Sequence, residues 1–87
     1  MMPTISRFFG IAVRIYYDDH APPHFHVYYG SDAAEIEVAT LRLISGRFPR
    51  RALAMVLEWA ADHREELLRD WALAESHDPL ESIPPLE

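Results

Sequence analysis

Short stretches in which apolar and polar residues alternate dominate the first half of the chain. Alternation of period two, rich in β-branched and aromatic residues, is typical of strands with one buried face. It predicts strands at 11–18, 24–29 and 34–38, and a shorter one at 41–44. The links between them are short, whereas parallel strands need long crossovers, so we expect an antiparallel meander of three to four strands. Gly46 is expected to end this sheet.

Apolar residues recur at helical spacing in the second half, from Arg50 to about Glu75. The residues on this stripe are Leu53, Val56, Leu57, Ala60, Leu67, Leu68, Trp71 and Ala74. Pro49 suits the first turn of a helix, where its missing N–H costs nothing. Because Arg64 interrupts the stripe, the pattern fits one long C-terminal helix or two consecutive helices, 50–61 and 63–75. Trp59 falls outside the stripe.

The two patterns together predict the fold class. A sheet with one apolar face needs a cover, and the helical stripe supplies it, so we expect an α+β fold with the sheet first. The chain has 87 residues, which suits one domain, here residues 1–75. Residues 76–87 contain three of the seven prolines and show no periodicity, so they are expected to form an extended or mobile tail.

The absence of cysteine and of long apolar runs excludes several classes of site and of location. The chain has no cysteine, which excludes disulfides, thiolate metal sites and cysteine nucleophiles, and which suits a reducing compartment. No apolar run reaches the length that spans a bilayer, and the N-terminus lacks the pattern of a signal peptide. We therefore expect a cytoplasmic protein without a membrane partner.

Charge is distributed unevenly along the chain. The net charge is −6, all eight basic residues are arginine, and residues 1–51 carry +1 whereas residues 52–87 carry −7. A net-acidic chain is a poor non-specific coat for nucleic acid, because phosphate binding relies on clustered cations. A local basic patch on the first half remains compatible with these numbers.

Histidines cluster where the first predicted strand connects to the second, in the segment DDHAPPHFH. His24 and His26 share one face of a strand, and His20 stands in the connecting loop, from which it can fold back. Three imidazoles suit Zn²⁺ or a similar divalent ion, with or without Asp18 or Asp19 as a further ligand.

The same histidines fit two other interpretations. His24 and His26 can act as a metal-free acid–base pair on a phosphodiester, with His20 orienting them. Alternatively, the three side chains fix the turn through hydrogen bonds or contact a partner, without chemistry. The spacing alone does not choose among these interpretations.

Three arginines surround Pro49 at the predicted helix start. Arg47, Arg50 and Arg51 lie where free N–H groups and the helix dipole attract anions, and arginine adds bidentate recognition of phosphate. They are candidates for binding a phosphate or an acidic partner. The alternative is that they are solvated side chains that balance the acidic helix behind them.

Most of the chain resembles one known family. The matching parts are PTISRFFGIAVRIYYDDHAPPHFHVYYG and GRFPRRALAMVLEWAADHREELLRDW, and the string DDHxPPHFHV is the most specific feature. These parts resemble the small bacterial domain-of-unknown-function 4160 family. The resemblance implies a cytoplasmic bacterial protein with a small protein partner, because members are often encoded beside another small protein and described as toxin–antitoxin components. It assigns no catalytic residue.

Three hypotheses for the function follow. The first is an interaction module, one half of a toxin–antitoxin-like pair, which binds a protein partner and in some settings nucleic acid; an exposed sheet edge would also allow homo-oligomers. The second is a small ribonuclease or phosphodiesterase that uses His24 and His26, with His20, as catalytic residues. The third is a metal-binding hydrolase or sensor domain that uses the same three histidines. Whether the protein is an enzyme stays open.

Overall fold

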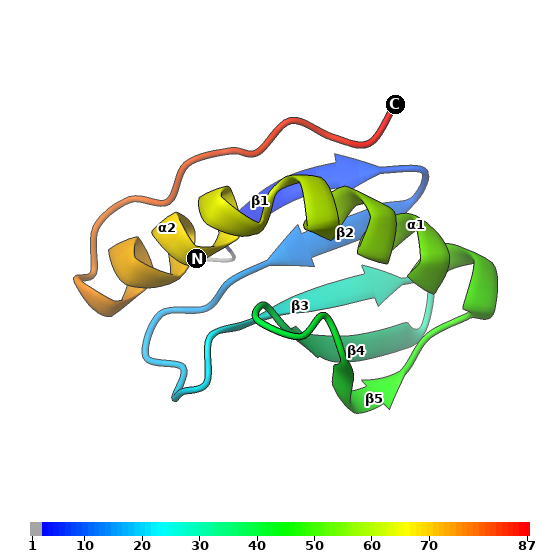
Figure 1. Cartoon of the computed structure of the whole chain (residues 1–87), viewed down its shortest axis with the longest axis horizontal. Helices are drawn as coiled ribbons and strands as arrows, with labels where there is room; N and C mark the ends of the chain where they lie inside the picture. Colours follow the sequence, from blue (N-terminus) through cyan, green and yellow to red (C-terminus); the bar gives the residue numbers. More distant parts are fainter. Residues whose placement is uncertain (1–2) are drawn as a thin grey trace.

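Five antiparallel strands followed by two helices make up the fold (Figure 1). The computed structural model describes residues 3–87. The strands form one sheet in sequence order, and they are β1 Thr4–Phe8, β2 Ile11–Arg14, β3 His24–Tyr29, β4 Asp32–Glu37 and β5 Leu43–Arg47. The helices are α1 Arg50–Asp62 and α2 Arg64–Glu75. The predicted α+β meander with C-terminal helices is confirmed, with two consecutive helices.

The strand count is higher than the three to four predicted, because β1 was missed. Where β1 pairs with β2, the register shifts between Thr4 and Ser6. This irregularity leaves two successive residues, Ile5 and Ser6, both buried. A bulge of this kind breaks the period-two pattern on which the prediction depended.

The last strand also differs from the prediction. Gly46 lies inside β5 and does not end the sheet. Its φ is +81°, and a Cβ at this position would lie 2.2 Å from the carbonyl oxygen of Ala33 on β4. Glycine is therefore needed here for close approach of the two strands, as well as for its positive φ.

The core lies between one face of the sheet and the two helices. Alternate residues of the strands meet the helices there. Fully buried residues of this core include Val13, Ile15, Phe25, Val27, Ile36, Val38, Val56 and Leu67. Trp59 belongs to this core, and its placement outside the helical stripe was wrong. Its ring lies 5.3 Å from that of Phe8, so α1 reaches across the sheet to β1.

The break between the helices falls at His63. Arg64, the residue that interrupts the apolar stripe, donates from Nε to the carbonyl oxygen of Val38 at 3.1 Å. This hydrogen bond links the start of α2 to the end of β4, and the Arg64 side chain stays outside the core. Among residues 3–87, neither helix combines the length and apolar character that crossing a bilayer requires.

The C-terminal segment after α2 runs back along the helices towards β1 (Figure 1). Residues 79–87 form no helix or strand. Ile83 is nonetheless buried, and its N–H donates to the carbonyl oxygen of Ile5 at 2.8 Å. Trp59 Nε1–H donates to the carbonyl oxygen of Pro84 at 2.8 Å. The segment thus covers part of the β1 edge and of the core.

Candidate functional site

The connection between β2 and β3 brings a carboxylate back over the start of β3. Asp18 has a φ of +65°, a left-handed conformation that the short polar side chain of aspartate tolerates better than most. The turn places Asp19 next to the two histidines of β3. The turn thus brings Asp19 close to His24 and His26, which lie five and seven positions further along the chain.

One carboxylate oxygen of Asp19 contacts both imidazoles. Asp19 Oδ2 lies 3.2 Å from His24 Nε2 and 2.9 Å from His26 Nε2. The side chains are 20%, 6% and 16% exposed, respectively, so the cluster is largely shielded from water. On its other side, His24 Nδ1 lies 2.8 Å from the carbonyl oxygen of Pro22. Glu35 Oε1, from β4, lies 3.6 Å from His24 Nε2.

Aromatic side chains enclose the cluster. The Trp71 ring of α2 lies 5.1 Å from the His24 ring, and the Tyr16 ring meets that of His26 edge-on at 4.6 Å. The hydroxyls of Tyr16 and Tyr28 are hydrogen-bonded at 2.7 Å. Burial and this hydrogen bond raise the pKa of Tyr28 to about 12. The Tyr28 hydroxyl is therefore neutral near pH 7.

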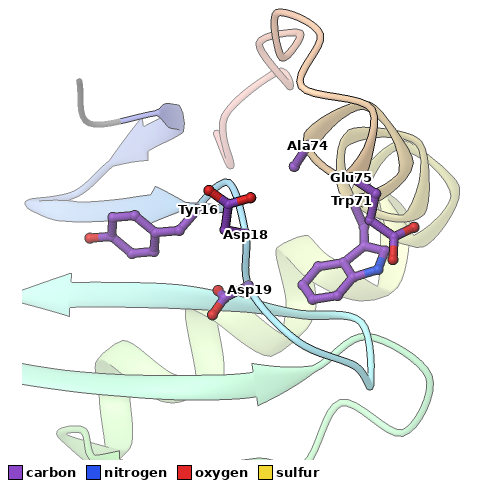
Figure 2. Close-up of a pocket in the computed structure, with 6 residues that line it drawn as sticks. All are labelled: Tyr16, Asp18, Asp19, Trp71, Ala74 and Glu75. Atoms are coloured by element: carbon purple, nitrogen blue, oxygen red, sulfur yellow. The ribbon is translucent and has the colours of Figure 1, made fainter.

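A pocket of about 220 Å³ opens beside the cluster. Figure 2 shows its two walls, with Tyr16, Asp18 and Asp19 on the β2–β3 side and Trp71, Ala74 and Glu75 on α2. Its lining contains three carboxylates and no lysine or arginine. Asp18 Oδ1 lies 3.1 Å from His77 Nε2 at the rim. The pocket therefore attracts cations and repels anions.

The structure brings together only some of the candidate residues named from the sequence. His24 and His26 meet, and Asp19, named as an optional ligand, lies between them. Within residues 3–87, these three form the group whose ligand atoms lie within 4.8 Å of one another. His20 is exposed in the loop and is not part of that group.

Sequence reasoning missed two members of the surroundings, Glu35 and Trp71. Glu35 lies directly opposite His26 in the β3–β4 ladder. Alternation in each strand predicts which face Glu35 and His26 lie on. The register between the two strands, which the sequence does not give, decides that they are opposite each other. Trp71 was assigned to the core stripe, which is correct, yet its ring also forms a wall of the pocket. No sequence signal places α2 over the start of β3.

The candidate anion-binding arginines lie at the far edge of the sheet. Arg47 ends β5, and Arg50 and Arg51 begin α1. Together with Arg42 and the rest of β5 they form a surface that we call the basic edge, residues 42–51. All four arginines are exposed, and none takes part in the ion pairs found in residues 3–87.

Arg47 of the basic edge shares one face of the sheet with the histidines. Cross-strand pairing sets Tyr28, Ala33 and Arg47 in one row. Two residues further along, it sets His26, Glu35 and Ser45 in the next row. Side chains two residues apart point the same way, so Arg47 lies on the face of His26 but two strands away. The arginines therefore do not line the pocket.

Comparison with known proteins gives one match. The model of a family described as Domain of unknown function (DUF4160) matches residues 10–72. The matched region includes β2 to β5, the whole Asp19–His24–His26 cluster and α1, and it ends just after Trp71. No curated protein and no solved structure matches the chain.

Proposed function

We propose that the chain, which belongs to the DUF4160 family, is an interaction module that binds a small protein partner through its basic edge. The pair would act in the cytoplasm as a toxin–antitoxin-like unit. A chain without cysteine suits that reducing compartment. The observation that carries the proposal is an exposed edge strand with exposed arginines at both ends.

The β5 strand has the properties of a surface that another chain completes. All five of its residues are exposed, and Leu43 and Ile44 are 37% and 46% exposed. An edge strand presents unpaired backbone N–H and C=O groups, and proteins usually cover or charge such an edge. An extended partner segment can add to it as a further strand, with backbone hydrogen bonds giving affinity and side chains giving specificity.

Charge indicates which partner fits this edge. Residues 42–51 contain four arginines and no Asp or Glu, against a net charge of −6 for the chain, so the remaining residues carry −10. An extended acidic segment of the partner would complement the basic edge locally. A second copy fits less well, since pairing of two β5 strands would bring two arginine-rich edges of like charge together.

The ribonuclease hypothesis has less support than partner binding. A phosphodiester that reached His24 and His26 through the pocket would meet the carboxylates of Asp18, Asp19 and Glu75. Repulsion between these carboxylates and the negatively charged phosphodiester opposes binding. The arginines that would hold the phosphate lie two strands away, and His20, its proposed orienting residue, is exposed outside the cluster.

Titration of the purified chain with the purified product of the neighbouring gene tests the proposal. We expect amide resonances of β5 to shift, and Arg42→Glu or Arg47→Glu to weaken binding by about 3- to 10-fold each. Arg7→Glu is the matched control, because Arg7 is also exposed but lies on β1 at the opposite edge.

Two results would contradict the proposal. One is that Arg7→Glu weakens binding as much as Arg42→Glu. The loss would then follow from the change in net charge and not from a contact at the basic edge. The other is that duplex DNA or RNA, and not the protein, shifts the β5 resonances, which would make the basic edge a phosphate-binding surface.

A further inference from the structure

We propose that Asp19, His24 and His26 form a binding site for a first-row divalent metal ion of the zinc class, with one position open to the adjacent pocket. This inference goes beyond partner binding, and its residues lie two strands from the basic edge. It differs from the ligand set expected from the sequence, because Asp19 takes the place of His20.

The hydrogen bond behind His24 sets the protonation of its ring. The carbonyl oxygen of Pro22 can only accept, so His24 Nδ1, at 2.8 Å, carries a proton. In the neutral ring Nε2 then holds a lone pair. That lone pair faces Asp19 Oδ2 at 3.2 Å and Glu35 Oε1 at 3.6 Å, which are acceptors when ionised. Acceptors that converge in this way need either a cation or a further proton between them.

The same hydrogen bond is the usual support of a metal-ligating histidine. Such histidines donate the second ring N–H to a backbone carbonyl or a carboxylate, which fixes the tautomer and the orientation of the ring. His24 is held in addition by the ring of Trp71. The structure therefore holds one ligand rigidly in the orientation that coordination needs.

Two of the ligand-atom separations suit a shared ion, and all three ligand atoms lie within 4.8 Å of one another. Metal–ligand distances of about 2.0–2.2 Å imply ligand atoms roughly 2.8–3.1 Å apart in facial octahedral geometry and roughly 3.3–3.6 Å apart in tetrahedral geometry. Asp19 Oδ2 lies 2.9 Å from His26 Nε2 and 3.2 Å from His24 Nε2. Two imidazole nitrogens and one carboxylate oxygen form a set that suits Zn²⁺, Fe²⁺ or Co²⁺ better than Mg²⁺ or Ca²⁺.

The surroundings favour a cation and leave room for a further ligand. Asp18 and Glu75 add negative charge across the pocket, and Glu35 adds it from β4. Since Asp19 belongs to both the cluster and the pocket lining, an ion bound to it would lie beside the pocket. The pocket of about 220 Å³ can hold water or a small metal-binding ligand at the open position.

One alternative uses the same contacts without a metal. A doubly protonated His24 would donate from Nδ1 to Pro22 and from Nε2 to Asp19. Stoichiometric metal binding distinguishes the two arrangements, since a proton-bridged pair has no reason to bind one equivalent of Zn²⁺ at the same atoms.

Titration of the metal-stripped full chain with Zn²⁺, in competition with a chromophoric chelator, tests the proposal. We expect saturation at one equivalent and shifts of the His24 and His26 ring resonances. Co²⁺ should give the visible absorption of a coordinated ion. Asp19→Asn and His26→Ala should each weaken binding by more than about 100-fold, because loss of outer-shell partners alone costs about 10- to 100-fold.

The control variants are His20→Ala and His77→Ala, which remove exposed histidines outside the cluster. Both should bind Zn²⁺ within about two-fold of the wild type. Asp19 and His26 are preferred to the more buried His24 for substitution, and a dispersed amide spectrum checks that each variant folds.

Absence of saturable binding would overturn the proposal. So would control variants that lose as much affinity as Asp19→Asn, since the ion would then sit on surface histidines. Neither result bears on partner binding at the basic edge, which is measured with a different ligand and different variants.

Discussion

At the scale of single residues, the buried carboxyl group of Asp70 affects the stability of the fold. Asp70 is 1% exposed, and its Oδ1 accepts the N–H of Glu81 at 2.8 Å. Its other oxygen, Oδ2, has no hydrogen-bond partner among residues 3–87. Burial raises the pKa of Asp70, with the backbone hydrogen bond from Glu81 opposing the shift. A buried carboxylate of this kind destabilises the fold when it is ionised.

The pH dependence of stability should show this effect. With a folded-state pKa above the unfolded one, the contribution of Asp70 is most favourable at low pH and is lost as pH rises through the folded pKa. We therefore expect Asp70→Asn to gain in stability relative to the wild type between pH 4 and pH 7. Urea unfolding at several pH values measures the difference. The exposed Asp62→Asn is the control, and a difference that is constant with pH would contradict the assignment.

At the scale of elements, the two edges of the sheet are treated differently. The β1 edge is covered in part by the C-terminal segment, through the hydrogen bond from Ile83 to Ile5. The β5 edge is bare, and its course depends on a bulge near Ile44 and on Gly46. Bulges and short length are common means of limiting uncontrolled strand addition. The bulge and the short length of β5 thus limit the ways in which another strand can pair with this edge.

Substitution of Gly46 should disturb that edge. Gly46→Ala combines a positive φ with a contact of 2.2 Å to the Ala33 carbonyl oxygen. We expect it to lower the free energy of unfolding by about 1–3 kcal/mol and to shift the β4–β5 amide resonances. Gly30→Ala has a φ of +58° and no atom within 4 Å, so it should cost about 1 kcal/mol. Equal effects of the two would show that the close contact is unimportant.

The C-terminal segment should contribute to stability through Ile83. This side chain is buried in the core although it lies outside any helix or strand. Ile83→Ala should lower the free energy of unfolding by about 2–4 kcal/mol, as for other large-to-small changes in a core. Ile44→Ala, the same substitution at an exposed position, should cost less than about 1 kcal/mol. Similar losses at the two positions in denaturant unfolding would contradict the packing of the segment.

At the scale of the whole molecule, ion binding at the proposed metal site should be coupled to the stability of the fold. Its ligands come from the β2–β3 connection and from β3, and Trp71 of α2 packs against His24. A ligand that binds only the folded state stabilises it by about 2.7 kcal/mol at 100 times its Kd. For a domain of this size that corresponds to a rise in Tm of about 10 °C or more.

Thermal unfolding with and without Zn²⁺ measures this coupling. The wild type should show the rise, and Asp19→Asn should show little change in Tm on addition of Zn²⁺. His20→Ala should respond as the wild type does. A rise that persists in Asp19→Asn would place the ion elsewhere.

The sequence predicted those parts of the fold whose patterns are local and regular. Alternation identified β3 with its observed bounds and β4 within two residues, and the apolar stripe identified both helices. It failed at β1, where a bulge interrupts alternation, and at Trp59, whose burial depends on how α1 crosses the sheet. The histidine pair and Asp19 were found because they are close in sequence. Glu35 and Trp71 were not, because only the β3–β4 register and the position of α2 bring them near.

The sequence by itself determined the α+β class, the shared face of His24 and His26, and the basic segment before α1, since each follows from spacing along a single element. The tertiary structure decided what depends on contacts between elements. It put Asp19 rather than His20 between the imidazoles, opened an acidic pocket under Trp71, and left β5 as the bare edge. The physical reason is that strand register, turn conformation and helix packing are settled by burying the whole core at once, and no single segment carries that information.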